Sequence, residues 1–262
     1  MFRLLSLELR KIFQLWSVRA SLTALAVLPL VVVLAADDFG QSGVVIVNAA
    51  QVAGASLVGV MQTLIYIMVA AAAAELVAGE SVQGTLRTLL LRPITRASLI
   101  SAKLVAAALF PFLGLGLMLL SSLVLAGISR GFGALPAGSG TVVGPGGWVG
   151  LGQTIPIAEA LREVAFSYSL AAFAMIPVAF LAVLLAVITM NAGVSALGAY
   201  ALIGFMGLGA FFPAIRDVLL TSHTGLWYRE GGGGLGLSLG ALAIYTAGLA
   251  IASVLSFDRK DL

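Results

Sequence analysis

The stretch GESVQGTLRTLLLRPITRASLISAK, Gly79–Lys103, interrupts a chain that is otherwise almost pure Ala, Leu, Val and Ile. It carries five charged residues, which are Glu80, Arg87, Arg92, Arg96 and Lys103. A charge at the centre of a bilayer costs roughly 2.5–3.5 kcal/mol on insertion scales, so five would cost on the order of 15 kcal/mol. The segment is long enough to cross a membrane, but its charges predict that it stays outside the hydrocarbon.

The composition of the chain indicates a membrane protein. Of 262 residues, 61% are hydrophobic and 10% are charged, whereas soluble domains average about 25% charged residues. The absence of cysteine excludes disulfides and cysteine-ligated metals, and the single histidine, His223, disfavours a histidine metal cluster. The basic residues lie beside apolar runs and form no continuous patch, so we expect no nucleic-acid partner.

Runs of about 20 apolar residues predict the helices that cross the hydrocarbon core. We expect an all-α integral membrane protein in which residues 1–262 form one transmembrane domain with six spans. These spans are Ala20–Ala36, Val52–Ala74, Leu104–Ile128, Phe166–Met190, Gly193–Phe212 and Leu235–Ser256.

The distribution of Lys and Arg predicts the orientation of the spans. With both termini in the cytoplasm, ten of the 14 basic residues lie inside and four outside. The outer four are Arg130, Arg162, Arg216 and Arg229. We therefore expect a multi-pass protein of the cell membrane with cytoplasmic termini and the segment 79–103 in the cytoplasm.

The N-terminal residues 1–18 have the pattern of an amphipathic helix. Phe2, Leu5, Leu9, Ile12 and Trp16 recur at alternating spacings of three and four. This pattern predicts a helix lying in the membrane interface, with its cations near the lipid headgroups. A cleaved signal peptide is the alternative, but its removal would place the charged segment outside the cell.

Within the charged segment, the local signals predict a short amphipathic helix. Ser81 can cap it, and Val82, Leu86, Leu89 and Leu90 form one apolar stripe. Pro93 ends the helix, and Thr95 can then cap the third span. The result is a rigid element held between two membrane helices.

At this point the segment resembles the signature of type-2 ABC transporter permeases. The matching positions are Glu80, Gly84-Thr85-Leu86, Leu89-Leu90, Pro93, Ile94, Thr95-Arg96, Leu99-Ile100 and Lys103. Ala102 stands where the family often has glycine, and the C-terminal SFDRKDL is similar to the family's usual ending. About 25 residues carry the likeness sharply, and the architecture agrees over the whole chain.

The resemblance implies the membrane subunit of an ATP-driven exporter, without an ATPase site of its own. It implies a second permease subunit as partner and a cytoplasmic ABC ATPase subunit that holds ATP and Mg²⁺, so that this chain binds no cofactor itself. The implied ATPase-docking residues are Glu80, Gln83, Gly84, Thr85, Leu86, Arg87, Leu90, Pro93, Arg96 and Asn191. The possible substrate path is lined by Gln62, Tyr66 and Tyr200, and its lack of charge favours an apolar or amphipathic substrate.

Three other functions remain open at the level of sequence. GISRG around Ser129, followed by acids and His223, has the pattern of a serine hydrolase, although a serine at a helix end is more often a cap. An ATP-independent scaffold and a mechanotransmissive ABC complex are the others. GESVQGT lacks the lysine of a phosphate loop, which disfavours nucleotide binding by this chain.

Some single residues carry narrower expectations. Glu75, at the inner end of the second span, could pair with Lys103 or Arg96, or remain an interfacial carboxylate. We expect His223 to be solvated in an outer loop. Trp227 and Tyr228 suit a membrane interface.

Overall fold

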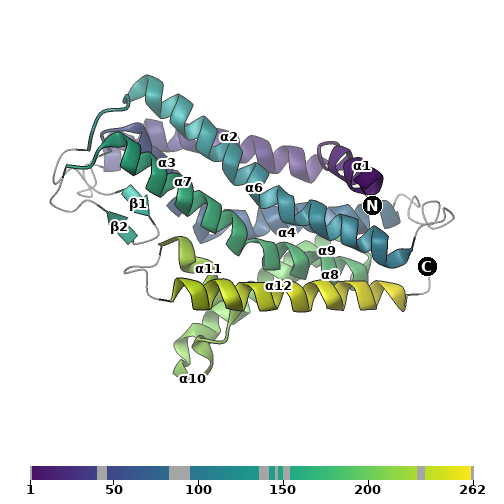
Figure 1. The fold of residues 1–262 in the computed structure, drawn as a ribbon. Coiled ribbons are helices and arrows are strands. Elements are labelled where there is room, and N and C mark those ends of the chain that lie inside the picture. The colour runs from purple at the N-terminus through teal and green to yellow at the C-terminus, as the bar shows by residue number, and fades with distance from the viewer. Residues whose placement is uncertain are drawn as a thin grey trace.

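The computed structural model describes residues 2–39, 46–82, 95–135, 142–144, 147–149, 154–228 and 234–260. Its elements are α1 (Phe2–Ile12), α2 (Trp16–Phe39), α3 (Ala49–Gln62), α4 (Leu64–Val82), α6 (Arg96–Ser129), β1 (Val142–Gly144), β2 (Gly147–Val149), α7 (Ile157–Ala174), α8 (Ile176–Thr189), α9 (Ala192–Leu208), η2 (Gly209–Phe211), α10 (Pro213–Arg216), α11 (Leu220–Thr224), η3 (Gly225–Tyr228) and α12 (Leu235–Asp258). The helices lie roughly along one axis (Figure 1). The prediction of an all-α fold is confirmed, apart from the small antiparallel hairpin β1–β2.

Four stretches of the described chain are long and apolar enough to cross a membrane. They are Trp16–Ala35, Arg96–Ser129, Ile157–Thr189 and Leu235–Asp258. The pair α3 and α4 together meets the same criterion, and α9 is a shorter apolar helix.

The predicted span Val52–Ala74 corresponds to two helices, because α3 and α4 meet at an angle of 65°. The break falls at Thr63, whose φ of −148° takes the backbone out of the helical region. A helix interrupted in this way leaves backbone groups that neighbouring protein must cover.

The predicted span Phe166–Met190 also differs from the structure. Its helix begins at Ile157 and includes Glu159 in its first turn. A carboxylate in the first turn is stabilised by the positive end of the helix dipole. The break between α7 and α8 falls at Met175, two residues before Pro177, as expected for a residue that cannot donate a helical hydrogen bond.

Helix α4 lies at the centre of the bundle and packs on α2, α6, α8 and α9. Its run of small residues Ala70–Ala74 is almost entirely buried, and such residues let neighbouring helices approach closely. By contrast, only 11% of the residues in an apolar 18-residue stretch of α12 are buried within the chain. Helix α12 therefore presents most of its apolar surface outward.

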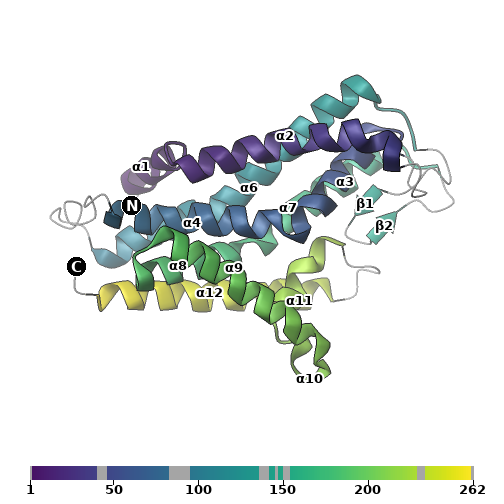
Figure 2. The ribbon, with the colours of Figure 1, turned by 180° about the vertical axis from the view of Figure 1, so that it is seen from behind.

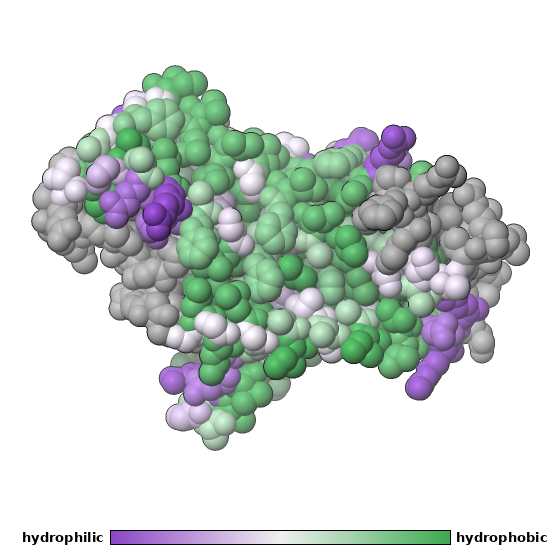
Figure 3. Space-filling model, in the orientation of Figure 1, coloured by the Kyte–Doolittle hydropathy of each residue, from purple (hydrophilic) through white to green (hydrophobic). Residues whose placement is uncertain are grey.

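On the face shown in Figure 3, a wide apolar band crosses the middle of the molecule, and hydrophilic residues gather toward the ends. Large apolar side chains are exposed on several helices, among them Leu34 at 74%, Phe205 at 74% and Ile244 at 75% of their full accessibility. An apolar surface of this extent is compatible with a membrane location. The two termini lie at the same end of the long axis in both views (Figures 1 and 2).

The N-terminal helix is shorter than predicted. Helix α1 ends at Ile12, and Trp16 begins α2 with 79% of its surface exposed. Helix α1 packs on α6, with Glu8 and Ile12 both about 1% exposed. Around Glu8 and Ile12, this helix is therefore covered by protein.

Candidate functional site

The candidate site is the charged end of the molecule, where α4 ends and α6 begins. These two helices flank the segment that resembles the permease signature. Its predicted docking residues Gln83, Gly84, Thr85, Leu86, Arg87, Leu90 and Pro93 lie outside the described residues. Ser81 does not open a new helix, because α4 continues through it to Val82.

Four charged side chains from three helices meet at this end, and we call them the ion cluster: Glu8, Lys11, Glu80 and Lys103. Lys103 Nζ lies 3.2 Å from Glu8 Oε2 and 2.8 Å from Glu80 Oε2. Lys11 Nζ lies 2.7 Å from Glu80 Oε1 and 3.4 Å from Glu8 Oε1. Each carboxylate thus contacts both ammonium groups.

Attraction between the opposite charges of the ion cluster compensates for the hydration that its members lose on burial. Lys103 is 0% exposed and Glu8 about 1%, and isolated charges at such positions would lose several kcal/mol of hydration. Two carboxylates and two ammonium groups compensate one another, and Lys103 Nζ also donates to the Leu76 carbonyl oxygen at 2.6 Å. The cluster therefore links α1, α4 and α6 with no net charge.

Lys11 is the most accessible member of the ion cluster. Its partial burial alone would lower its pKa, but the hydrogen bond to Glu80 and the charges of Glu8 and Glu80 outweigh that effect and raise the pKa above 10.5. A raised lysine pKa contributes stability that is fully present below the unfolded pKa and is lost as the pH rises through the folded pKa. Lys11 therefore remains a cation at neutral pH.

Glu75 does not pair with Lys103 or Arg96, as the sequence had suggested it could. Its Oε2 accepts hydrogen bonds from the backbone N–H of Ser17, at 3.2 Å, and from the Ser17 hydroxyl. Ser17 lies in the first turn of α2, whose N–H groups lack helical partners. Glu75 on α4 thus caps α2 from a distant part of the chain.

A second set of contacts joins the C-terminus to this end. Arg96 Nη1 donates to the carbonyl oxygens of Asp258, at 3.3 Å, and Lys260, at 2.6 Å. Lys260 Nζ donates to the carbonyls of Val187 and Ile188 at the end of α8, both at 2.6 Å. Basic side chains satisfy the last carbonyls of a helix in this way, so α6, α8 and α12 are tied together here.

Asn191 lies in the tight turn between α8 and α9, which the sequence predicted. Met190 has a left-handed backbone with φ of 53°, and the Asn191 side chain accepts from the Val194 N–H at 3.1 Å. The Thr189 and Ser195 hydroxyls lie 2.7 Å apart and complete the turn. The turn lies directly beyond the Val187 and Ile188 carbonyls that Lys260 binds.

The residues predicted for a substrate path come from helices that pack together. Tyr66 is on α4 and Tyr200 on α9, and these two helices are direct neighbours. The Tyr66 hydroxyl donates to Thr224 Oγ1 of α11 at 3.0 Å, whereas Tyr200 is half-buried. Gln62 is the last residue of α3, at the bend, and its side chain lies outside the described part.

At the opposite end, the prediction of a solvated His223 is wrong. His223 is 2% exposed, with Nδ1 3.2 Å from Ser238 Oγ and Nε2 2.9 Å from the Asp217 carbonyl oxygen. Ser129 Oγ donates to the Leu125 carbonyl of its own helix at 3.0 Å. Both ring nitrogens and the hydroxyl are thus engaged elsewhere, which disfavours the serine hydrolase.

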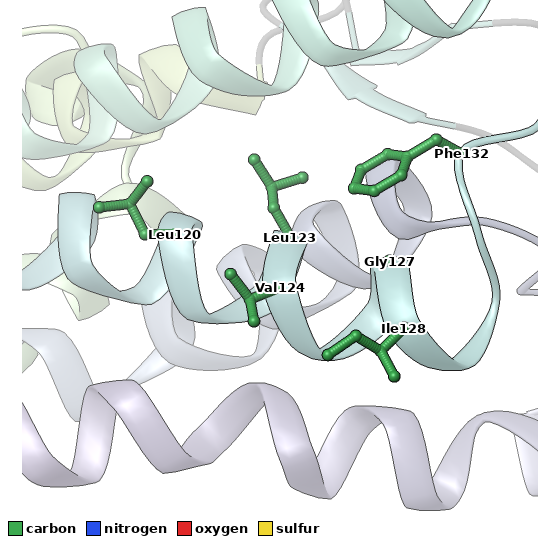
Figure 4. A pocket seen from close by; sticks show the side chains of 6 residues that line it. All are labelled: Leu120, Leu123, Val124, Gly127, Ile128 and Phe132. Carbon is green, nitrogen blue, oxygen red and sulfur yellow. The ribbon is translucent and has the colours of Figure 1, made fainter.

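Trp227, near the same end, is only 8% exposed. Its segment η3 packs on α7, so the indole contributes to the core at this end. Near the same end an open apolar pocket of about 390 Å³ is lined by Leu120, Leu123, Val124, Gly127, Ile128 and Phe132 (Figure 4). Its lining consists of hydrocarbon and aromatic groups, so it offers surface for apolar contact and no catalytic group.

Sequence reasoning missed Glu8 as the partner of Lys103. A signal was present, since Glu8 lies three residues after Leu5 and four before Ile12, on the apolar stripe of its helix. A carboxylate on the buried face of an amphipathic helix requires a compensating cation. Lys103, the last residue of the segment 79–103, is that cation.

The arrangement defines an all-α protein with several apolar helices of membrane-spanning length and a neutral ion cluster buried at one end. The chain belongs to the family described as "Protein of unknown function (DUF2705)", whose model matches residues 21–262. The matched region contains Glu80 and Lys103, while Glu8 and Lys11 precede it. A search of curated proteins finds no match to the chain.

Proposed function

We propose that this chain is the permease subunit of an ATP-binding-cassette exporter, with ATP and Mg²⁺ bound by a separate cytoplasmic ATPase subunit. The observation that carries the proposal is the charged segment 79–103, whose sequence resembles the coupling segment of type-2 permeases. Support comes from the ion cluster at its base. Glu80 and Lys103 stand near the two ends of the segment, and Lys103 Nζ lies 2.8 Å from Glu80 Oε2. The ion pair therefore holds the two ends of the segment close together.

The contacts at this end suggest how the segment would transmit force. The ion cluster joins α4 and α6 to α1, and Arg96 and Lys260 join α6 to α12 and α8. An ATPase that binds residues 83–94 would therefore move several helices as one body, as in hinge and shear transitions. Glu80 then acts within the chain as a positioning residue, and the turn at Asn191 offers the second docking point.

In this proposal the chain crosses the membrane six times, through α2, α3–α4, α6, α7–α8, α9 and α12. Helix α9 is the shortest, since 17 residues extend about 25 Å. The three residues of η2 add about 6 Å, which brings the length to the roughly 30 Å of a hydrocarbon core. An even number of crossings agrees with termini at one end, which the excess of basic residues assigns to the cytoplasm.

The transported substrate is apolar or amphipathic in this proposal, and two permease subunits form its path. The bent pair α3–α4 and its neighbour α9 would line that path. The side chains named for it, Gln62, Tyr66 and Tyr200, are polar and uncharged. An ion would require compensating charges along the path.

Affinity purification of the full chain from its native membrane tests the proposal. The wild type is expected to retain a soluble ATPase in about 1:1 ratio, identified by mass. The double variant Gly84→Pro with Arg87→Glu should lose that ATPase while still inserting, because it breaks and recharges the docking helix. Arg216→Glu, at the opposite end, is the matched charge-reversal control and should retain the ATPase.

Two outcomes would contradict the proposal. An ATPase absent from well-inserted wild-type protein would favour an ATP-independent scaffold. Equal loss in the double variant and in Arg216→Glu would show that charge in general, and not the segment 79–103, determines the association.

A further inference from the structure

A groove between α6, α8 and α12 is the feature that the proposed function leaves unexplained. Its volume is about 410 Å³, which is within the roughly 300–1,000 Å³ of ligand pockets. Leu104 of α6 and Phe180 of α8 form its floor, at 5% and 8% exposure. Val105, Ile251 and Leu255 form its open sides, at 40%, 60% and 51% exposure.

The groove is lined by apolar residues apart from Ser101, and it extends toward the charged end of the molecule. Ser101, the one hydroxyl-bearing residue of its lining, is five residues from Arg96 at the start of α6. On α12, Arg259 follows Leu255 by one turn, or about 6 Å. Ile251, Leu255 and Arg259 recur every four residues, so the exposed Arg259 continues the face of α12 that lines the groove.

The charges at this end of the groove are mainly positive. The Arg96 guanidinium bridges from α6 to the carbonyl oxygens of Asp258, at the end of α12, and Lys260, so it lies where two of the three groove-forming helices meet. Lys260 is next to it and binds the end of α8. Among the described residues here, the carboxylate of Asp258 is the opposing charge, so three cations stand against one acid; Asp261, next along the chain, lies outside the described residues.

We propose that this groove binds an anionic phospholipid, with an acyl chain against Leu104, Phe180 and Ile251 and the phosphate beside Arg259 and Arg96. The division of the surface into a hydrocarbon groove and a basic end matches the two parts of such a lipid. Basic residues at the cytoplasmic side between membrane helices favour anionic headgroups. The site needs a membrane-embedded chain, but it does not depend on an ATPase partner.

Titration of the purified full chain in detergent with two lipids of equal acyl chains, phosphatidylglycerol and phosphatidylcholine, tests the site. Native mass spectrometry reports occupancy. The wild type should bind phosphatidylglycerol at least tenfold more tightly at low ionic strength. Arg259→Gln should weaken that lipid about fivefold, since one cation near a membrane surface contributes about that factor, and should leave phosphatidylcholine unchanged.

A second variant tests the groove independently of charge. Ala250→Phe fills the groove from α12 and should weaken both lipids, while its unfolding temperature verifies the fold. Arg216→Gln is the matched control at the opposite end and should bind as the wild type does. Equal affinity of the wild type for both lipids, or equal losses in Arg259→Gln and Arg216→Gln, would overturn the proposal.

Discussion

At the end that carries both termini, the buried polar groups are charged and neutralise one another across three helices. At the opposite end they form hydrogen bonds without an ion pair among the described residues, as in the contacts of His223 with Ser238 and the Asp217 carbonyl. Removing one member of a charged group leaves an uncompensated buried charge, at a cost of about 3–5 kcal/mol, whereas removing a neutral partner leaves an unsatisfied donor or acceptor, at a cost of about 1–3 kcal/mol. The two ends should therefore differ strongly in their sensitivity to substitution.

The difference also indicates at which end the relative position of the helices is determined most strictly. The ion cluster is satisfied only when α1, α4 and α6 have one particular rotation and depth. A hydroxyl that binds the carbonyl of its own helix, as Ser129 does, is satisfied wherever that helix lies. The charged end thus fixes the relative position of its helices, which suits an end that would receive force from a partner.

The largest expected effect is that of Lys103→Met. It leaves Glu8 and Glu80 facing Lys11 alone, and breaking a buried ion pair from one side costs about 3–5 kcal/mol. The free energy of unfolding, measured in mixed micelles, should fall by that amount. Adding Glu8→Gln restores neutrality and should recover a substantial part of the loss. Additive losses in the double variant would show that the cluster is not coupled.

An intermediate effect is expected at Glu75. Glu75→Leu removes the acceptor that caps α2 and should lower the free energy of unfolding by about 1 kcal/mol, as for other N-caps. Glu75→Gln keeps one acceptor oxygen and should lose less. The same unfolding assay measures both, and an unchanged stability in the leucine variant would contradict the cap.

The smallest effect is expected at Ser129, which is exposed at the end of α6. Ser129→Ala should change stability by no more than about 0.5 kcal/mol, the usual range for surface sites. The wild type should also remain unlabelled by a fluorophosphonate probe, because the serine and His223 are engaged elsewhere. Labelling that disappears in Ser129→Ala would instead support the serine hydrolase.

The sequence alone determined the elements of this protein. Its apolar runs predicted the helices, Thr95 was recognisable as a cap, and the gap between the fourth and fifth predicted spans marked the turn at Asn191 before α9. These features are local, because a cap satisfies N–H groups three residues away and an apolar run reports the environment of its own helix. The outer hairpin and the bend at Thr63 had no comparable signal, since each depends on contacts with other helices.

Only the tertiary structure decided which side chains meet. The sequence offered Lys103 or Arg96 as a partner for Glu75, or no partner at all, while the fold pairs Lys103 with Glu8 and Glu80. The fold also buries His223, which the sequence predicted to be solvated. The physical reason is that a helical period shows which face of one helix is apolar. The partner of a buried charge depends on the rotation and depth of the neighbouring helix, which the packing of the whole bundle determines.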